Sequence, residues 1–545
     1  MLSALPYLVN YPYECIEQTL NRFVSTSILS QMFHKYPQLK KMARQFSSKR
    51  KKQFENFRFD DPNRLIMLEE TPWLNEAQGG RRNEEELINV LNPEVAQQNQ
   101  TSSLRKLRES QTAVGGFPWF SGGAPDPYIT LLVIHGFAKA VEFGEQLPKD
   151  MIIKAWNYIY SHFKKYPLEK QNLHFLIFAN YLASSFPDSS WTGKFFSVNE
   201  RQKILGYTFK YWRDISPYEK AFLSLTLQRM KRPKEAHLVF DSIMDSAKFA
   251  EDQGLYWAPE DRSWLWYNDT IESHAYVLRA LTELSPKDSR REALVQWLFL
   301  HKKLNHWKST RATAEVLYSL AHYLEDNQQL GIKESINVKV GEQKHHYDFA
   351  PDKYSGKSRQ WVIPGSKINP QTMSHIEIVK TDPALGFAAA TWHFSTDKLP
   401  KQAHGDFMSV TRRYYLREKK NNKVTLRPLA NGMTIHIGDE IEVHLSLRAK
   451  HEVQYVHLRD PRPAGLEPGV VTSGWEWDLG LSRYREIRDS ATNFFFSRLP
   501  VGEYTLKYRA KAYMAGTFKA APARLQSMYA PEFGAYSAGQ LLVIR

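Results

Sequence analysis

The chain is 545 residues long, 42% of its residues are hydrophobic, and its formal net charge is +15. This length allows about three domains of roughly 150 residues, and the apolar fraction excludes a wholly disordered chain. A basic chain can bind nucleic acids, acidic glycans or anionic membranes. The sequence has no paired metal-ligand cysteines, no glycine-rich aromatic RNA-binding motif and no leucine zipper. We therefore expect no nucleic-acid partner, no metal and no cofactor.

The sequence contains no segment that predicts a transmembrane helix or a signal peptide. Its most apolar run, residues 128–138, is too short to cross a bilayer and contains His135. The first nine residues lack a basic region followed by an apolar core and a small-residue cleavage site. They read like the interior of a longer protein, so we expect any targeting signal or membrane anchor to lie in a preceding region.

Residues 15–325 have the periodicity of helices, with apolar residues recurring every three or four positions. The clearest blocks begin roughly 40 to 55 residues apart, which fits one helical hairpin per unit. Serial hairpins form either an open solenoid or a closed α/α toroid. We expect closure, because the region ends without polar capping repeats. The blocks are 128–140, 174–182, 218–227, 271–284 and 311–324.

Two joints of the helical region are rich in aromatic residues, and a third segment is basic. Residues 115–123 and 257–267 hold the aromatic residues, which are typical both of binding loops at a toroid rim and of hairpin caps. Residues 40–52 hold seven Lys and Arg residues, which favours a solvated face over a phosphate-binding patch.

From about residue 328 the apolar pattern alternates, which predicts half-buried β-strands. Residues 499–504, Leu-Pro-Val-Gly-Glu-Tyr, resemble a tyrosine corner, a feature of Greek-key β-sandwiches. We divide this half near residue 402, because 403–545 is long enough for one sandwich whereas 329–402 is not. The predicted fold class is therefore multidomain, an α/α toroid followed by β domains.

The single cysteine, Cys15, precedes Gln18 by three positions. A lone cysteine is commonly a small buried apolar residue. A thiol and a carboxamide on the same side of a tight turn can instead condense, with loss of ammonia, into an internal thioester. The Gln18 carbonyl would then be an electrophile for lysine amines, hydroxyls or water. Such a bond survives only where water is excluded, and Tyr11, Pro12 and Tyr13 have the right residue types for a lid.

Residues 11–19, Tyr-Pro-Tyr-Glu-Cys-Ile-Glu-Gln-Thr, resemble the thioester motif of the α2-macroglobulin and complement family, especially its bacterial branch. Gly115–Phe120 and Ser527–Glu532 are similar to two further motifs of that branch. The resemblance implies three domains: an α/α-toroid thioester domain (1–328), the returning half of a CUB-like β domain (329–402) and a macroglobulin-like C-terminal β-sandwich (403–545). The bait region and other macroglobulin domains would lie upstream.

The resemblance also implies roles for individual residues. Cys15 and Gln18 would form the thioester, and Thr130 occupies the position of the complement-type histidine, so that lysines would react directly. Glu14 stands where many relatives have glycine, which leaves an unformed thioester open. His135, a little over one turn beyond Thr130, fits an ordinary helix-face histidine. The residues that would shield the bond are Tyr11, Tyr13, Met528 and Tyr529.

The leading interpretation is a fragment of a broad-spectrum protease inhibitor of bacterial defence that traps proteases covalently through their surface lysines. Capture is used once, so we expect no enzyme, and we expect a periplasmic or cell-surface location through an upstream anchor. One alternative is a polysaccharide lyase of the toroid-plus-sandwich type. Another is a family member with an inactive thioester that acts as a binding module. The lyase candidates are His274, Tyr267, Asn268 and Arg262.

Overall fold

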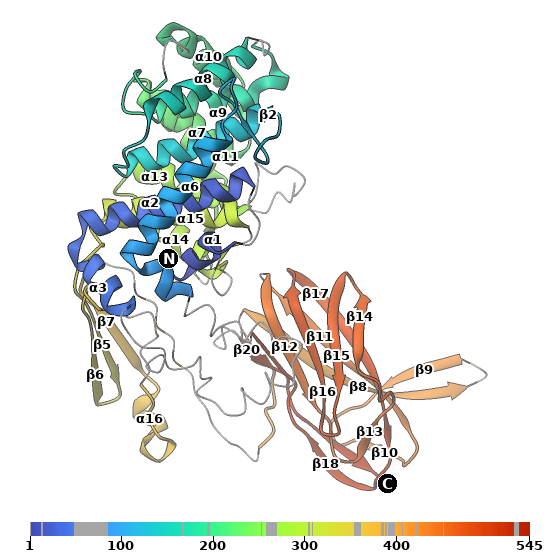
Figure 1. Cartoon of the computed structure of the whole chain (residues 1–545). Helices are drawn as coiled ribbons and strands as arrows, with labels where there is room; N and C mark the ends of the chain where they lie inside the picture. The colour runs from blue at the N-terminus through green and yellow to red at the C-terminus, as the bar shows by residue number, and fades with distance from the viewer. Residues whose placement is uncertain are drawn as a thin grey trace. The chain divides into compact units, whose positions relative to one another are not determined.

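The computed structural model divides the chain into two compact units, one ending at Gly386 and the other reaching Arg545 (Figure 1). The predicted three-domain boundaries stay a prediction. The structure describes all residues except the following: 1, 12–14, 48–85, 165–167, 193–196, 252, 258–269, 303–305, 308, 354–360, 383–385, 387, 389, 391–397, 406, 421–422, 451 and 528–533.

The first unit is a closed ring of helices. In the described part of the chain, six inner helices pack in the order α2, α7, α9, α11, α13 and α15, and α15 packs back on α2. The predicted closure into an α/α toroid is therefore confirmed. The inner helices are α2 (Ile16–Lys35), α7 (Pro127–Glu142), α9 (Leu173–Ser184), α11 (Pro217–Arg229), α13 (Thr270–Leu284) and α15 (Thr310–Asp326).

An outer helix follows each of the first five inner helices and packs on it. Successive inner helices therefore run in the same direction, since each outer helix returns the chain to the starting end. The outer helices are α6 (Pro93–Ser110), α8 (Lys149–Phe163), α10 (Val198–Lys210), α12 (Pro233–Asp245) and α14 (Arg290–Leu300). Shorter elements complete the unit: α1 (Leu5–Val9), α3 (Pro37–Ser47), α16 (Pro370–Met373), and the hairpins β1 (Phe117–Pro118) with β2 (Pro125–Asp126) and β3 (Lys248–Ala250) with β4 (Gly254–Tyr256).

Local sequence determines where the inner helices begin. Asp126, Ser216 and Ser309 each accept a hydrogen bond from a backbone N–H of the first turn that follows, at 3.0 to 3.3 Å. Proline occupies the first helical position of α7 and α11, where its missing N–H costs nothing. These caps fix the residues at which α7, α11 and α15 begin.

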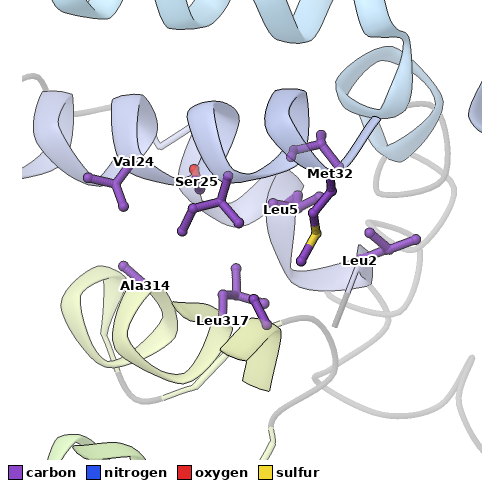
Figure 2. A pocket seen from close by; sticks show the side chains of 10 residues that line it. Leu2, Leu5, Val24, Ser25, Met32, Ala314 and Leu317 are labelled. Carbon is purple, nitrogen blue, oxygen red and sulfur yellow. The ribbon is translucent and has the colours of Figure 1, made fainter. Parts of the chain in front are cut away.

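Helix α1 packs on both α2 and α15, at the seam where the ring closes. Figure 2 shows the small apolar pocket at this seam, with Leu5 of α1, Val24 of α2 and Leu317 of α15 in its wall. Cys15 precedes Val24 by nine residues, or about 13 Å of helix. The pocket therefore belongs to the packing of the seam and not to the region around Cys15.

A three-stranded antiparallel sheet follows the toroid within the first unit. Its order is β6-β5-β7, with Ile336 opposite Tyr347 on one side and Val340 opposite Ile376 on the other. The strands are β5 (Glu334–Val340), β6 (Gln343–Phe349) and β7 (Ile376–Lys380). In the basic segment, α3 carries Lys41 and Arg44 on exposed positions, as expected for a solvated face.

The second unit is a β-sandwich, and its two large sheets share one hydrophobic core. One sheet has the order β13-β17-β11-β8-β9, the other β14-β15-β16-β12-β19-β20, and a small sheet has the order β10-β21-β18. The strands are β8 (Met408–Lys420), β9 (Lys423–Pro428), β10 (Thr434–Ile435), β11 (Glu440–Ala449), β12 (Val453–Pro461), β13 (Leu466–Pro468), β14 (Gly474–Asp478), β15 (Leu481–Ile487), β16 (Ala491–Leu499), β17 (Gly502–Ala512), β18 (Gly516–Ala520), β19 (Arg524–Ser527), β20 (Gly534–Tyr536) and β21 (Gln540–Ile544).

The predicted tyrosine corner is present at the turn into β17. The Tyr504 hydroxyl donates to the backbone carbonyls of Pro500 and Val501, at 3.3 and 3.2 Å. The sequence prediction of a helical part followed by β-sheets is confirmed.

Helices α2 and α7 pack closely at Gly136, where an added Cβ would lie 2.6 Å from Leu20 and 2.9 Å from Val24. Gly136→Val should lower the free energy of unfolding of the toroid by about 2–3 kcal/mol, because the helices must move apart. Denaturant unfolding followed by the helical circular-dichroism signal measures this. The matched control is Gly206→Val in α10, where no atom lies within 4 Å. A change in the control as large as that at Gly136 would contradict the packing argument.

Candidate functional site

Cys15 is the N-cap residue of α2, with extended backbone angles (φ −78°, ψ 168°). Gln18 is the third residue of the helix, and its side chain reaches back so that Oε1 accepts the Cys15 backbone N–H at 3.1 Å. This is the geometry of a capping box, in which the N-cap and third residues satisfy one another's backbone N–H groups. The predicted pair thus lies on one side of a single helical turn.

The Cys15 thiol is 8% exposed, and burial raises its pKa. The negative charge of Glu17 raises this pKa further, and the backbone N–H of Gln18 opposes the shift. A more basic thiolate is a poorer leaving group. The environment of Cys15 would therefore slow the cleavage of an acyl group attached to its sulfur.

The Gly115–Phe120 segment lies against the start of α2, where the Trp119 carbonyl accepts the Ile16 N–H at 2.9 Å. Its two glycines are required by close approach. Gly115 has a φ of +92°, and an added Cβ would lie 2.3 Å from the Lys154 carbonyl oxygen. At Gly116 a Cβ would lie 2.7 Å from the ring of Tyr158. The motif therefore fits a turn pressed between α8 and the first residue of α2.

Thr130 fixes the other side of this turn. Its hydroxyl accepts the Phe117 backbone N–H at 2.8 Å and donates to the Asp126 carbonyl at 2.7 Å. The side chain is fully buried. Sequence reasoning assigned this position only the absence of a histidine and missed its structural role. The signal was a threonine one turn after an N-cap aspartate, where the hydroxyl can bond the i−4 carbonyl.

Two of the three aromatic residues of this turn are exposed, whereas Phe117 is fully buried. Trp119 is 43% exposed and packs on Tyr128, with 5.9 Å between ring centroids, and Phe120 is 66% exposed. In the other aromatic joint Trp257 is buried, and the residues from 258 to 267 lie outside the described part of the chain.

The start of α2 belongs to a rim formed by the first turns of all six inner helices. Every inner helix contributes at least one polar side chain from its second or third position. Arg311 and the His174–Glu219 pair, described below, connect these turns. The rim residues are Glu17, Tyr128, His174, Tyr218, Glu219, Glu272 and Arg311.

Arg311 joins three of the inner helices at this rim. Its guanidinium donates to the hydroxyls of Tyr128 and Tyr218, at 3.4 and 3.3 Å, and lies 3.5 Å from the Glu272 carboxylate. These contacts come from α7, α11 and α13, while His174 of α9 contacts Glu219 of α11. The N-termini of the inner helices therefore meet at one end of the ring, and Cys15 lies at that end.

A cavity of about 50 Å³ lies at the rim, with Tyr128, Arg311, His135 and Glu315 among its lining residues. His135 is buried, and its Nε2 is hydrogen-bonded to the Tyr276 hydroxyl. Burial and the nearby charge of Lys139 hold the pKa of His135 well below its usual value. His135 is thus a neutral histidine inside the ring.

The structure describes one of the four residues that are predicted to shield the thioester. Tyr11 is half-buried, its carbonyl accepts a hydrogen bond from Arg22 of α2 at 3.3 Å, and its ring meets that of Tyr7 edge-on. This ties the segment before Cys15 to the helix. The other three predicted shield residues, Tyr13, Met528 and Tyr529, lie outside the described residues. Pro12 and Glu14 lie outside them as well.

Among the lyase candidates, His274 is the one that the structure describes. It is 1% exposed, and its ring stacks on that of Trp297 with 3.5 Å between the ring centroids. Its Nδ1–H donates to the Thr270 carbonyl. Its Nε2 accepts the Trp257 N–H at 3.3 Å, and burial lowers its pKa to about 3. With both nitrogens bonded to backbone, His274 is not available as a base for a glycan. Tyr267, Asn268 and Arg262 lie outside the described residues.

Within the described residues, no group of three or more His, Cys, Asp or Glu side chains could hold a metal ion. The same part of the chain has no helix long and apolar enough to cross a bilayer.

A closed toroid that presents Cys15 and Gln18 at one rim, followed by a β-sandwich, has the architecture that the motifs imply for the thioester-bearing region of α2-macroglobulins. Residues 408–532 match the family model for the bacterial α2-macroglobulin MG10 domain. The chain is also 22% identical, over 299 residues, to an α2-macroglobulin homolog of Nostoc sp. (strain PCC 7120). Residues 408–532 thus match a domain of bacterial α2-macroglobulins, and the chain is similar to the C-terminal region of these proteins, as its motifs predict.

The match to the Nostoc protein covers 52% of this chain and 15% of that protein's length. The chain is similar in structure to trypsin-activated α2-macroglobulin from Escherichia coli, at 14% identity and a TM-score of 0.45, covering 98% of this chain and 32% of that one. Native Escherichia coli α2-macroglobulin from domain MG7 to the C-terminus matches 99% of this chain and 75% of that one, at 16% identity and a TM-score of 0.35. Salmonella α2-macroglobulin reacted with methylamine matches 99% of this chain and 31% of that one, at 17% identity and a TM-score of 0.33.

Replacing Thr130 should loosen the turn that holds the start of α2. In Thr130→Val the buried Phe117 N–H loses its acceptor, which costs about 1–3 kcal/mol, so the Phe117 amide should exchange with solvent about tenfold faster or more. Hydrogen exchange followed by mass spectrometry or NMR measures this. Thr130→Ser keeps the hydroxyl and should keep the amide protected. Equal protection in both variants would contradict the role of the hydrogen bond.

Proposed function

We propose that this chain is the thioester-bearing part of a protease trap of the α2-macroglobulin type. Cys15 and Gln18 would form an internal thioester, and the Gln18 acyl group would pass to a surface lysine of the attacking protease. The observation that carries the proposal is the Cys15–Gln18 capping box, which folds the carboxamide of Gln18 back to the N-cap cysteine.

The first turn of α2 also supplies electrostatic help for the reaction. The Cys15 N–H already donates to Gln18 Oε1, and in the thioester the same donor would polarise the acyl carbonyl. The positive end of the helix dipole favours negative charge on that oxygen as a nucleophile adds. The buried Cys15 sulfur has the opposite effect on the reaction rate, because the raised pKa of its thiol makes the thiolate a poorer leaving group. The thioester would thus have a carbonyl that is activated for nucleophilic attack and a thiolate that leaves slowly.

Release would depend on the domains that surround the toroid. Cleavage of a bait region in upstream macroglobulin domains would move the domains apart and expose the bond to the protease. Transfer happens once, so the protein would act as an inhibitor and not as an enzyme. We also propose that the whole protein works in the periplasm or at the cell surface, anchored by a preceding region, as part of bacterial defence.

Thr130 supports direct transfer to lysines. Its hydroxyl is buried and engaged in two hydrogen bonds, so this position offers no side chain that could take over the acyl group. Transfer to hydroxyl groups through a histidine intermediate is therefore not expected here.

The intact mass of the gently purified, unheated protein should be lower than the sequence mass by one ammonia. Methylamine should then add at Gln18 and free the Cys15 thiol for labelling, because aminolysis breaks the thioester at its carbonyl. Peptide mapping locates the added group. Cys15→Ser is the control, and it should have the full sequence mass and take up no methylamine. A native protein with free Cys15 and unmodified Gln18 would contradict the covalent trap and favour the alternative of a binding module with an inactive thioester.

A further inference from the structure

Glu17 lies between the two residues of the predicted thioester and has an unusual environment. It is the second residue of α2, and its side chain is half-buried. Within the described part of the chain it forms no ion pair with a distance of 4.0 Å or less. Desolvation by burial raises its pKa. A carboxylate so placed is partly removed from water but has no charged partner in contact.

Glu17 interacts electrostatically with Cys15, the N-cap of its own helix, and with one residue each from α7 and α15. Its charge raises the pKa of the Cys15 thiol, and it also raises the pKa of Tyr128, which burial raises most. Arg311 is close enough to lower the pKa of Glu17 but is held at 3.5 Å from Glu272. Glu17 thus stands in the first turn of α2, two residues after Cys15 and one before Gln18, within electrostatic range of the hydrogen-bonded pair Arg311 and Tyr128.

We propose that Glu17 accepts the proton of the ammonium group that attacks Gln18, and so makes the thioester selective for lysine side chains and other primary amines. This inference rests on the proposed function. A lysine side chain arrives as an ammonium ion, which has no lone pair and cannot attack a carbonyl. A carboxylate at the attack site both attracts the ammonium ion and removes its proton, whereas a neutral hydroxyl gains no such attraction.

The proposed step is balanced in atoms and charge. The ammonium group gives one proton to the Glu17 carboxylate, and the resulting amine attacks the acyl carbon of Gln18. The tetrahedral intermediate collapses, the carbon–sulfur bond breaks, and the second proton of the amine passes to the Cys15 thiolate. The products are an amide at Gln18, a free Cys15 thiol and a protonated Glu17, which returns its proton to water.

The test compares two small nucleophiles on the intact chain. At neutral pH methylamine is almost entirely protonated, whereas hydroxylamine is almost entirely neutral. Glu17→Gln should lower the second-order rate of methylamine addition about tenfold or more, because it removes the base, and should leave the rate of hydroxylamine addition unchanged. Loss of the ammonia deficit and gain of each nucleophile are followed by intact mass.

Glu94→Gln is the matched control. Glu94 is also the second residue of its helix, α6, but it is exposed and far along the chain from Cys15. This variant should react like the wild type with both nucleophiles. An unchanged methylamine rate in Glu17→Gln, or an equal fall for both nucleophiles, would overturn the role of Glu17.

A second measurement covers the case in which Glu17→Gln does not form the bond. In the wild type, the ratio of methylamine to hydroxylamine rates should exceed the ratio for a small free thioester in the same buffer, because Glu17 lets the protonated amine react. A ratio no higher than that of the free thioester would falsify the proposal. Failure of the proposed function looks different, since the wild type would then show no ammonia deficit.

Discussion

The closure of the inner helices into a ring is the constraint on which the rest of the structure depends. Because an outer helix returns the chain after each inner one, the inner helices run in the same direction and their first turns meet at one rim. The contacts of Arg311 with Tyr128, Tyr218 and Glu272 show this directly, since all four residues stand at the second or third position of an inner helix. Cys15 caps one of these helices, so the ring decides which groups surround it.

The rim meets two requirements of a stored thioester. The bond must be kept from water, and Cys15 is buried at the junction of α2 with the Gly115–Phe120 turn. It must also be open to one class of nucleophile when it is released. The turn that covers the start of α2 is held by the hydroxyls of Thr130 and Thr112 and by the Gln111 carboxamide, and its two glycines allow close packing. Such a cover can be rigid while its aromatic residues, Trp119 and Phe120, remain partly exposed.

Much of this fold could be predicted from the sequence. The apolar blocks correspond to the inner helices α7, α9, α11, α13 and α15, because inner helices are buried on most of their surface and read as nearly continuous apolar runs. The outer helices are half-exposed and gave a weaker signal. The Cys15–Gln18 pair was also predictable, because three residues of separation at a helix start determine their geometry without help from the rest of the chain.

The surroundings of that pair were not predictable. Glu17, Tyr128 and Arg311 lie in separate parts of the sequence and meet only because the ring closes. In the sequence each is one charged or aromatic residue at the edge of an apolar block. The structural role of Thr130 was missed for a related reason. The residue that bonds to it, Phe117, belongs to a turn whose path depends on the close packing of Gly115 and Gly116 against α8.

The charged side chains along the ring axis differ from Glu17 in having ion-pair partners. Deep in the ring they are paired, as a buried charge must be. Lys139 pairs with Glu315, and Arg279 lies 2.9 Å from Glu283. At the rim Arg311 pairs with Glu272. Glu17 is half-buried, and Arg311 lowers its pKa without an ion pair to it while lying 3.5 Å from Glu272. Among the described residues the Glu17 carboxylate differs from these charges, because it has no ion pair within 4.0 Å and stands one position before Gln18 of the predicted reactive bond.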